Sequence, residues 1–124
     1  MTDRRFTQHF AVSELACRDS SPVPAKYYAN AVAICQRAEV LRKVSGPLIV
    51  VSGYRSPAHN RKVNGAKTSQ HLTASALDLR CPGVTAADLA DMYQELIDRG
   101  LVPDGGLGRY NNWIHIDIGK ARRW

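Results

Sequence analysis

The pattern of apolar and polar residues predicts helices and strands in both halves of this chain of 124 residues. Over residues 25–44, apolar side chains recur at approximately helical spacing, from Tyr28 through Val32 and Cys35 to Val40 and Leu41. Residues 48–51 are apolar at every position, which is typical of a buried strand. Residues 54–66 contain Gly, Pro and Asn and are predicted as a loop with one helical turn.

The second half begins with a predicted strand over residues 74–79. Thr85 is the predicted N-cap of a helix, with Asp88 at the capping-box position and Gly100 at the stop. The expected buried face of this helix contains Leu89, Met92, Tyr93, Leu96 and Ile97. Residues 107–108 and 113–118 are predicted to form a hairpin.

Two further helix starts are predicted near the N-terminus, a short helix capped by Ser13 and a second helix at Pro24. Together these elements predict an α+β fold, in which helices pack on a small, mainly antiparallel sheet. The length of 124 residues is that of a single domain, expected over residues 1–124. An apolar content of 44% is sufficient for a modest core.

The net charge of +6 favours an anionic partner, such as bacterial cell wall or nucleic acid. No nucleic-acid-binding motif is visible, and the basic residues are scattered, so we expect no nucleic-acid partner. A basic surface that only aids solubility is an equal alternative. Salt-dependent DNA binding would favour the nucleic-acid interpretation.

The cysteines and the first residues bear on localisation. Cys17, Cys35 and Cys81 are odd in number and widely spaced, which predicts a reducing compartment rather than a disulfide framework. The N-terminal stretch MTDRRFTQHF is charged and has no apolar segment, so no signal peptide is visible. No transmembrane run is present either. We expect synthesis in the cytoplasm, with monomer as the favoured oligomeric state.

His71, Asp78 and His115 supply two imidazoles and a carboxylate, which is the ligand set of a catalytic zinc site with one open position. His71 and Asp78 would lie about 10.5 Å apart along a helix and about 23 Å apart along a strand. Sharing one metal therefore requires a chain reversal between them, for which residues 73–75 are suited. The alternative is that these are ordinary surface or core residues.

Several segments together resemble one known family. Residues 69–78 resemble the signature SxHxxGxAxD, and residues 52–57 resemble its SGYRS segment. Residues 108–117 resemble its closing strand, and residues 9–17 its opening segment. Over nearly its whole length the chain is therefore similar to the zinc D-alanyl-D-alanine carboxypeptidase family, in its small single-domain branch of carboxypeptidases and peptidoglycan endopeptidases. The resemblance implies the hedgehog-type fold of that family.

The resemblance also implies a function: a zinc metallopeptidase that hydrolyses peptide bonds in peptidoglycan stem peptides or cross-links. His71, Asp78 and His115 would hold the zinc ion. Arg55 would bind substrate and stabilise developing negative charge. Ser69 and Tyr110 are further candidates for substrate binding, although Ser69 is equally suited to fixing a turn. D-Ala-D-Ala trimming, cross-link cleavage and L-Ala-D-Glu cleavage all remain open.

The chain departs from the family pattern at two positions. Ala74 replaces the signature glycine, which predicts a turn that is either strained or slightly different in conformation. Asn112 stands three residues before His115, where many relatives have an acidic general base. Asp117 shares the strand face of His115 and is the nearest alternative carboxylate. It could orient a ligand histidine, replace the missing base, or pair with an arginine.

Asn112 also supports a second function class, a phage tail or cell-wall-binding structural module that keeps the fold but has little activity. For the enzyme, an absent signal peptide implies that the wall is reached after lysis, through a partner, or in a phage particle.

Overall fold

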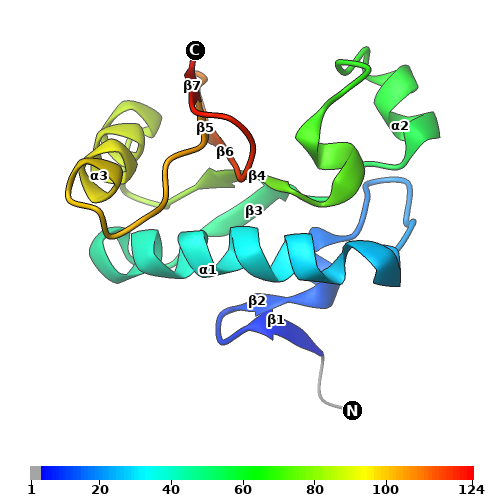
Figure 1. Cartoon of the computed structure of the whole chain (residues 1–124), viewed down its shortest axis with the longest axis horizontal. Helices are drawn as coiled ribbons and strands as arrows, with labels where there is room; N and C mark the ends of the chain where they lie inside the picture. The colour runs from blue at the N-terminus through cyan, green and yellow to red at the C-terminus, as the bar shows by residue number, and fades with distance from the viewer. Residues whose placement is uncertain (1–3) are drawn as a thin grey trace.

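The computed structural model describes residues 4–124, and Figure 1 shows their arrangement. Its helices are α1 (Tyr28–Ser45), α2 (Pro57–Lys62) and α3 (Ala86–Asp98). Three short 3₁₀ turns are η1 (Val12–Leu15), η2 (Ala25–Tyr27) and η3 (Gln70–Thr73). The strands are β1 (Arg5–Thr7), β2 (Phe10–Ala11), β3 (Ile49–Ser52), β4 (Ala76–Arg80), β5 (Gly106–Arg109), β6 (Ile114–Asp117) and β7 (Arg122–Arg123).

Five of these strands form one sheet in the order β3-β4-β6-β5-β7. All pairs are antiparallel except β5 with β7, which is parallel. Strands β1 and β2 form a separate hairpin, and α1 lies between this hairpin and the large sheet (Figure 1). The expected α+β fold with a small, mainly antiparallel sheet is therefore confirmed.

The two faces of the large sheet have different roles. Alternate residues of β4, β5 and β6 pack into one apolar core with residues of α1 and α3, namely Leu77, Leu79, Leu107, Ile114 and Ile116. Because side chains alternate along a strand, the residues between them point to the opposite face. That face carries Asp78, His115 and Asp117, as the strand pattern predicted.

Helix α1 begins after the turn that follows Pro24 and ends at Gly46, close to the predicted bounds. Of the apolar residues at helical spacing, Cys35 and Leu41 are buried, whereas Val32 and Val40 are only partly buried. The fully buried positions are Ala31, Ile34, Cys35, Ala38 and Leu41. Alanines on this face allow α1 to approach the sheet closely, which apolar size alone did not indicate.

Helix α3 follows its prediction closely. The Thr85 hydroxyl accepts a hydrogen bond from the Asp88 backbone N–H at 3.1 Å, and Gly100 follows the helix with a φ of +73°. The predicted cap at Ser13 is wrong, since Ser13 lies inside η1 and Ala11 precedes it. The Glu14 carboxylate instead accepts from the Ala11 backbone N–H at 2.8 Å, which satisfies a donor at the start of this turn.

Strand β3 corrects a second expectation. The apolar run over residues 48–51 predicted a buried strand, but β3 lies at the edge of the sheet and Ile49 is 38% exposed. Strands β1, β2 and β7 were not predicted, because two or three residues are too short for a periodic pattern. The three cysteines are free and buried. Within residues 4–124 we find no helix that is long and apolar enough to cross a membrane.

Candidate metal centre

Three side chains from different parts of the fold meet on the face of the sheet opposite the apolar core. His71 lies in η3, Asp78 in β4 and His115 in β6, and all three are buried. One ligand atom of each lies within 4.8 Å of the others. The Asp78 Oδ1 atom is 3.2 Å from His71 Nε2 and 3.1 Å from His115 Nδ1. The structure thus brings together the ligand set that the sequence predicted.

The predicted chain reversal brings His71 back to Asp78. At its start, the Ser69 hydroxyl accepts a hydrogen bond from the His71 backbone N–H at 3.2 Å, so Ser69 fixes the turn and also lines the cleft. At its end, Ala74 adopts the left-handed conformation, with φ +56° and ψ +29°. This is the position of the signature glycine, and the backbone there is strained for alanine as predicted.

Strand pairing brings His115 to Asp78. The β4–β6 register places Asp78 directly opposite His115, and Gly108 of β5 lies opposite His115 on the other side. Residues directly opposite each other in an antiparallel pair share a face of the sheet, so the carboxylate and the imidazole point the same way.

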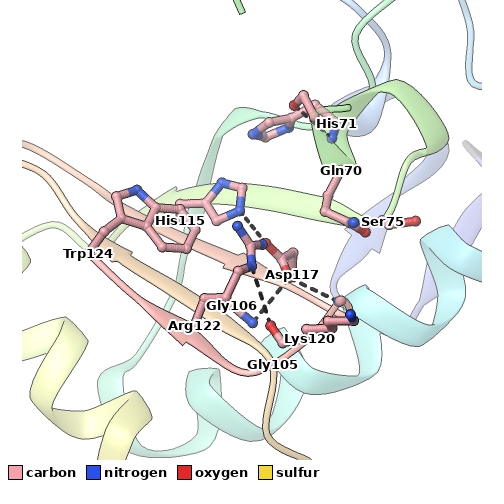
Figure 2. Close-up of polar contacts among 12 residues, drawn as sticks. Gln70, His71, Ser75, Gly105, Gly106, His115, Asp117, Lys120, Arg122 and Trp124 are labelled. Carbon is pink, nitrogen blue, oxygen red and sulfur yellow. Dashed lines mark hydrogen bonds and ion pairs between the residues drawn. The ribbon is translucent and has the colours of Figure 1, made fainter. Parts of the chain in front are cut away.

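The outer nitrogen of each imidazole is held by another protein group. His71 Nδ1 donates to the backbone carbonyl of Gly53 at 2.6 Å, which links the η3 turn to the segment after β3. His115 Nε2 donates to Asp117 Oδ2 at 2.7 Å (Figure 2). In the neutral tautomers that these contacts favour, His71 Nε2 and His115 Nδ1 are the nitrogens left to ligate a metal ion, and when protonated the same two nitrogens donate to Asp78. Such outer partners are typical of metal-ligating histidines, and the donor set suits zinc.

Asp117 is fully buried, and its carboxylate accepts from four donors (Figure 2). Its Oδ2 accepts from His115 and, at 2.6 Å, from the Arg122 guanidinium. Its Oδ1 accepts from the backbone N–H groups of Gly106 at 3.1 Å and Gly119 at 2.9 Å. Gly106 is required here, because a Cβ atom would lie 2.3 Å from a carboxylate oxygen.

The charges of the two carboxylates follow from these contacts. Burial by itself would raise the pKa of Asp78, but hydrogen bonds from His115 and His71 outweigh it and lower this pKa to about 2. Burial is likewise outweighed at Asp117, where the hydrogen bond from His115 and that from Gly119 lower the pKa to about 2. For His115, burial is outweighed by its bonds to Asp117 and Asp78, which raise its pKa. Both carboxylates are therefore ionised at neutral pH.

Arg55 lines the same cleft on the side of α2. Its Nη1 atom donates to the Asn60 side-chain carbonyl at 3.0 Å, and the Asn60 amide donates to the Ala66 backbone carbonyl at 3.0 Å. The Arg55 backbone N–H donates to the His71 carbonyl at 2.9 Å, which ties Arg55 to the ligand turn. Asn60 was missed at the sequence level, because a single buried amide in a short helix has no recognisable pattern.

The cleft above the three ligands has a volume of about 780 Å³. Tyr110, predicted as a substrate-binding residue, lines it, as do Lys120, Arg122 and Trp124, which were not predicted. These last three lie in the C-terminal segment, whose position depends on the pairing of β7 with β5. Asp78 and Asp117 carry the only side-chain carboxylates among the lining residues that the structure describes.

Asn112 lies outside the cleft. It is exposed in the hairpin between β5 and β6, and the cleft-lining residues of this hairpin are Tyr110 and Trp113. Among the described residues that line the cleft, the Asn112 amide is therefore not included.

Comparison with known proteins agrees with this geometry. Residues 8–117 match the sequence profile of the family described as Peptidase M15. The chain belongs to this family of zinc-dependent peptidases, which confirms the resemblance drawn from its motifs. The expected class, a peptidase, is thereby confirmed at the level of the family.

Two curated relatives carry more specific names. A protein of Haemophilus influenzae named probable peptidoglycan L,D-endopeptidase MepK is 35% identical over 82 residues, which are 60% of this chain and 41% of the relative. Peptidoglycan L,D-endopeptidase MepK of Escherichia coli strain K12 is 31% identical over 85 residues, which are 63% of this chain and 43% of the relative. The chain thus matches about two fifths of the length of these relatives.

Proposed function

We propose that this protein is a zinc-dependent peptidase that hydrolyses peptide bonds in peptidoglycan stem peptides or cross-links. The observation that carries the proposal is the buried His71–Asp78–His115 cluster at the base of an open cleft. Family membership supports the peptidase chemistry, and the names of the two relatives support the substrate class.

In this proposal His71 Nε2, an Asp78 oxygen and His115 Nδ1 hold the zinc ion. Zinc bound there would polarise the scissile carbonyl and make a water molecule more acidic. Gly53 and Asp117 keep the two imidazoles in the required tautomer and orientation through the hydrogen bonds described above.

We assign Arg55 to substrate binding and charge stabilisation. Its guanidinium lines the cleft, and Asn60 occupies only one of its nitrogens, so other N–H groups remain for the substrate. A fork of such donors can hold a peptide carboxylate or the oxygen on which negative charge develops. Ser69, whose hydroxyl fixes the η3 turn, remains a candidate for additional contact with the peptide.

For Asp117 we favour orientation of His115 over proton transfer. Both of its oxygens already accept two hydrogen bonds each, and its pKa is near 2. A carboxylate in this state accepts a proton poorly near neutral pH. The alternative role as a base predicts a different phenotype for Asp117→Asn, which is described in the Discussion.

The names of the relatives favour cleavage of an L,D bond over D-Ala-D-Ala trimming. The net charge of +6 favours adsorption to an anionic cell wall, reached after lysis or in a phage particle. A structural module of the wall or of a phage tail is the competing function.

Mass spectrometry of muropeptides after incubation with the zinc-loaded protein tests the proposal directly. We expect new fragments whose masses identify the bond that is cut, and no fragments with the chelated protein or with His71→Ala. If the wild-type protein binds stoichiometric zinc but leaves all muropeptides intact, the proposal fails in favour of the structural module.

A further inference from the structure

Three aromatic side chains form one wall of the cleft beside His115: Tyr110, Trp113 and Trp124. The rings of Tyr110 and Trp113 are stacked, with centroids 5.1 Å apart and planes 13° apart. The Trp124 ring lies 5.0 Å from the His115 ring (Figure 2). Tyr110 is 41% exposed and Trp124 is 44% exposed, although both are large aromatic residues. These rings therefore offer a substrate-facing surface next to the ligand cluster.

Trp124 is held firmly in this wall. Its backbone N–H donates to the Leu107 carbonyl at 3.2 Å, and its own carbonyl accepts from the Arg109 N–H at 2.7 Å. Its indole packs directly over Gly108, where a Cβ atom would lie 2.5 Å from the ring. The Arg122 guanidinium lies 4.8 Å from the ring centroid, within the range of a cation–π contact.

The indole N–H of Trp124 donates a hydrogen bond to the Tyr110 hydroxyl oxygen at 2.8 Å. An indole can only donate, so the Tyr110 oxygen is the acceptor in this pair. The single hydroxyl proton of Tyr110 must therefore point elsewhere. Within residues 4–124 no protein group accepts a hydrogen bond from this hydroxyl. Tyr110 lines the cleft, so the proton is available to a molecule bound there.

We propose that the Tyr110 hydroxyl donates a hydrogen bond to a backbone carbonyl or carboxylate of the peptide bound in the cleft, and that Trp124 is the positioning residue for this donor. The inference rests on the proposed function only in that a peptide occupies the cleft. Tyr110 acts here as a binding residue and takes no part in bond cleavage. Loss of this contact should therefore raise KM while leaving kcat nearly unchanged.

The test compares Trp124→Phe, Tyr110→Phe and the double variant on a cross-linked muropeptide. Both single changes keep an aromatic ring, and Tyr28→Phe is a matched control that removes a hydroxyl outside the cleft. We expect each single variant to raise KM by about 5-fold, as for loss of one neutral hydrogen bond, with kcat within about 2-fold. The KM of the double variant should equal that of Tyr110→Phe, because both changes remove the same contact with the peptide.

Circular dichroism and zinc content should be unchanged in all variants, which excludes misfolding. Calorimetric titration of the metal-free proteins with the same muropeptide gives a second readout that does not depend on turnover, and affinity should fall by the same factor. The inference is overturned if Trp124→Phe binds with wild-type affinity, if the effects of the two changes multiply, or if the wild-type protein does not bind the peptide. A wild-type protein that binds without cleaving refutes the proposed function and leaves this inference standing.

Discussion

At the scale of single residues, Arg55 is the cleft cation whose loss should affect turnover most. Arg55→Ala should lower kcat by roughly 100-fold, as for loss of one donor to a developing oxyanion, without changing zinc content. Arg55→Lys should recover little, because an ammonium does not reproduce the guanidinium fork. Steady-state kinetics on muropeptides provide the measurement. Arg61→Ala, at an exposed position of α2 outside the cleft, is the matched control. Near-native kinetics of Arg55→Ala would remove Arg55 from the site.

Asp117→Asn separates the two roles considered for Asp117. In the wild type, every group around the Asp117 carboxylate is a hydrogen-bond donor. In the variant, the asparagine N–H₂ group would face two of these donors, which disturbs the orientation of His115. We expect zinc affinity to fall by roughly 10–100-fold and activity to return at high zinc concentration. Zinc titration combined with kinetics measures both effects. Full zinc occupancy without activity would instead identify Asp117 as the proton carrier.

Ala74 tests the strain at the chain reversal. Ala74→Val should lower the free energy of unfolding by more than about 2 kcal/mol, because a β-branched residue tolerates positive φ poorly and the site is fully buried. Ala74→Gly relieves the backbone but loses a buried methyl group, so its net effect should be below about 1 kcal/mol. Urea unfolding of both variants measures the difference. Equal free energies of unfolding for Ala74→Val and Ala74→Gly would show that the backbone strain is negligible.

At the scale of elements, Glu39 of α1 anchors the β1–β2 hairpin. Its carboxylate accepts from the Thr7 hydroxyl and the His9 backbone N–H, both at 2.7 Å, and lies 2.7 Å from His9 Nδ1. Burial by itself would raise the pKa of Glu39, but the hydrogen bonds from His9 and Thr7 outweigh it and lower this pKa. The charged form of Glu39 therefore stabilises the attachment of the hairpin to α1.

Glu39→Gln should accordingly lower the free energy of unfolding by about 1.5–3 kcal/mol at pH 7. Because the folded pKa is the lower one, this contribution is complete above the unfolded pKa of about 4.3 and is lost as pH falls through the folded pKa. Urea unfolding of the variant and the wild type from pH 7 to pH 3 should show the two curves converging at low pH. Glu95→Gln, an exposed position of α3, is the control. A pH-independent difference would contradict the assignment.

At the scale of the whole molecule, the proposed zinc ligands join η3, β4 and β6, which are distant in sequence. Zinc that binds only the folded state adds about 2.7 kcal/mol at 100 times its Kd, or roughly 10 °C in Tm for a chain of this size. Differential scanning calorimetry with and without a chelator measures this shift. His71→Ala and His115→Ala should abolish most of it, whereas His59→Ala, outside the cluster, should keep it. Retention of the full shift in both ligand variants would refute the ligand set.

The sequence by itself determined the features that depend on neighbouring residues. Helix α3, with its cap at Thr85, follows from a 3.6-residue period and local capping chemistry. The candidate metal-ligand set was recognisable from its residue types together with the resembling motifs, and a chain reversal before Asp78 followed from the distance that a shared metal would allow. The family followed from several motifs in their expected order.

Only the tertiary structure decided the features that depend on long-range pairing. The edge position of β3 depends on which strands lie beside it, so an apolar run could not distinguish an edge from a centre. The backbone hydrogen bonds that the Asp117 carboxylate accepts require the β5–β6 pairing and the chain after β6. Trp124 reaches Tyr110 only because β7 pairs with β5, and no local periodicity in the sequence encodes a contact between strands.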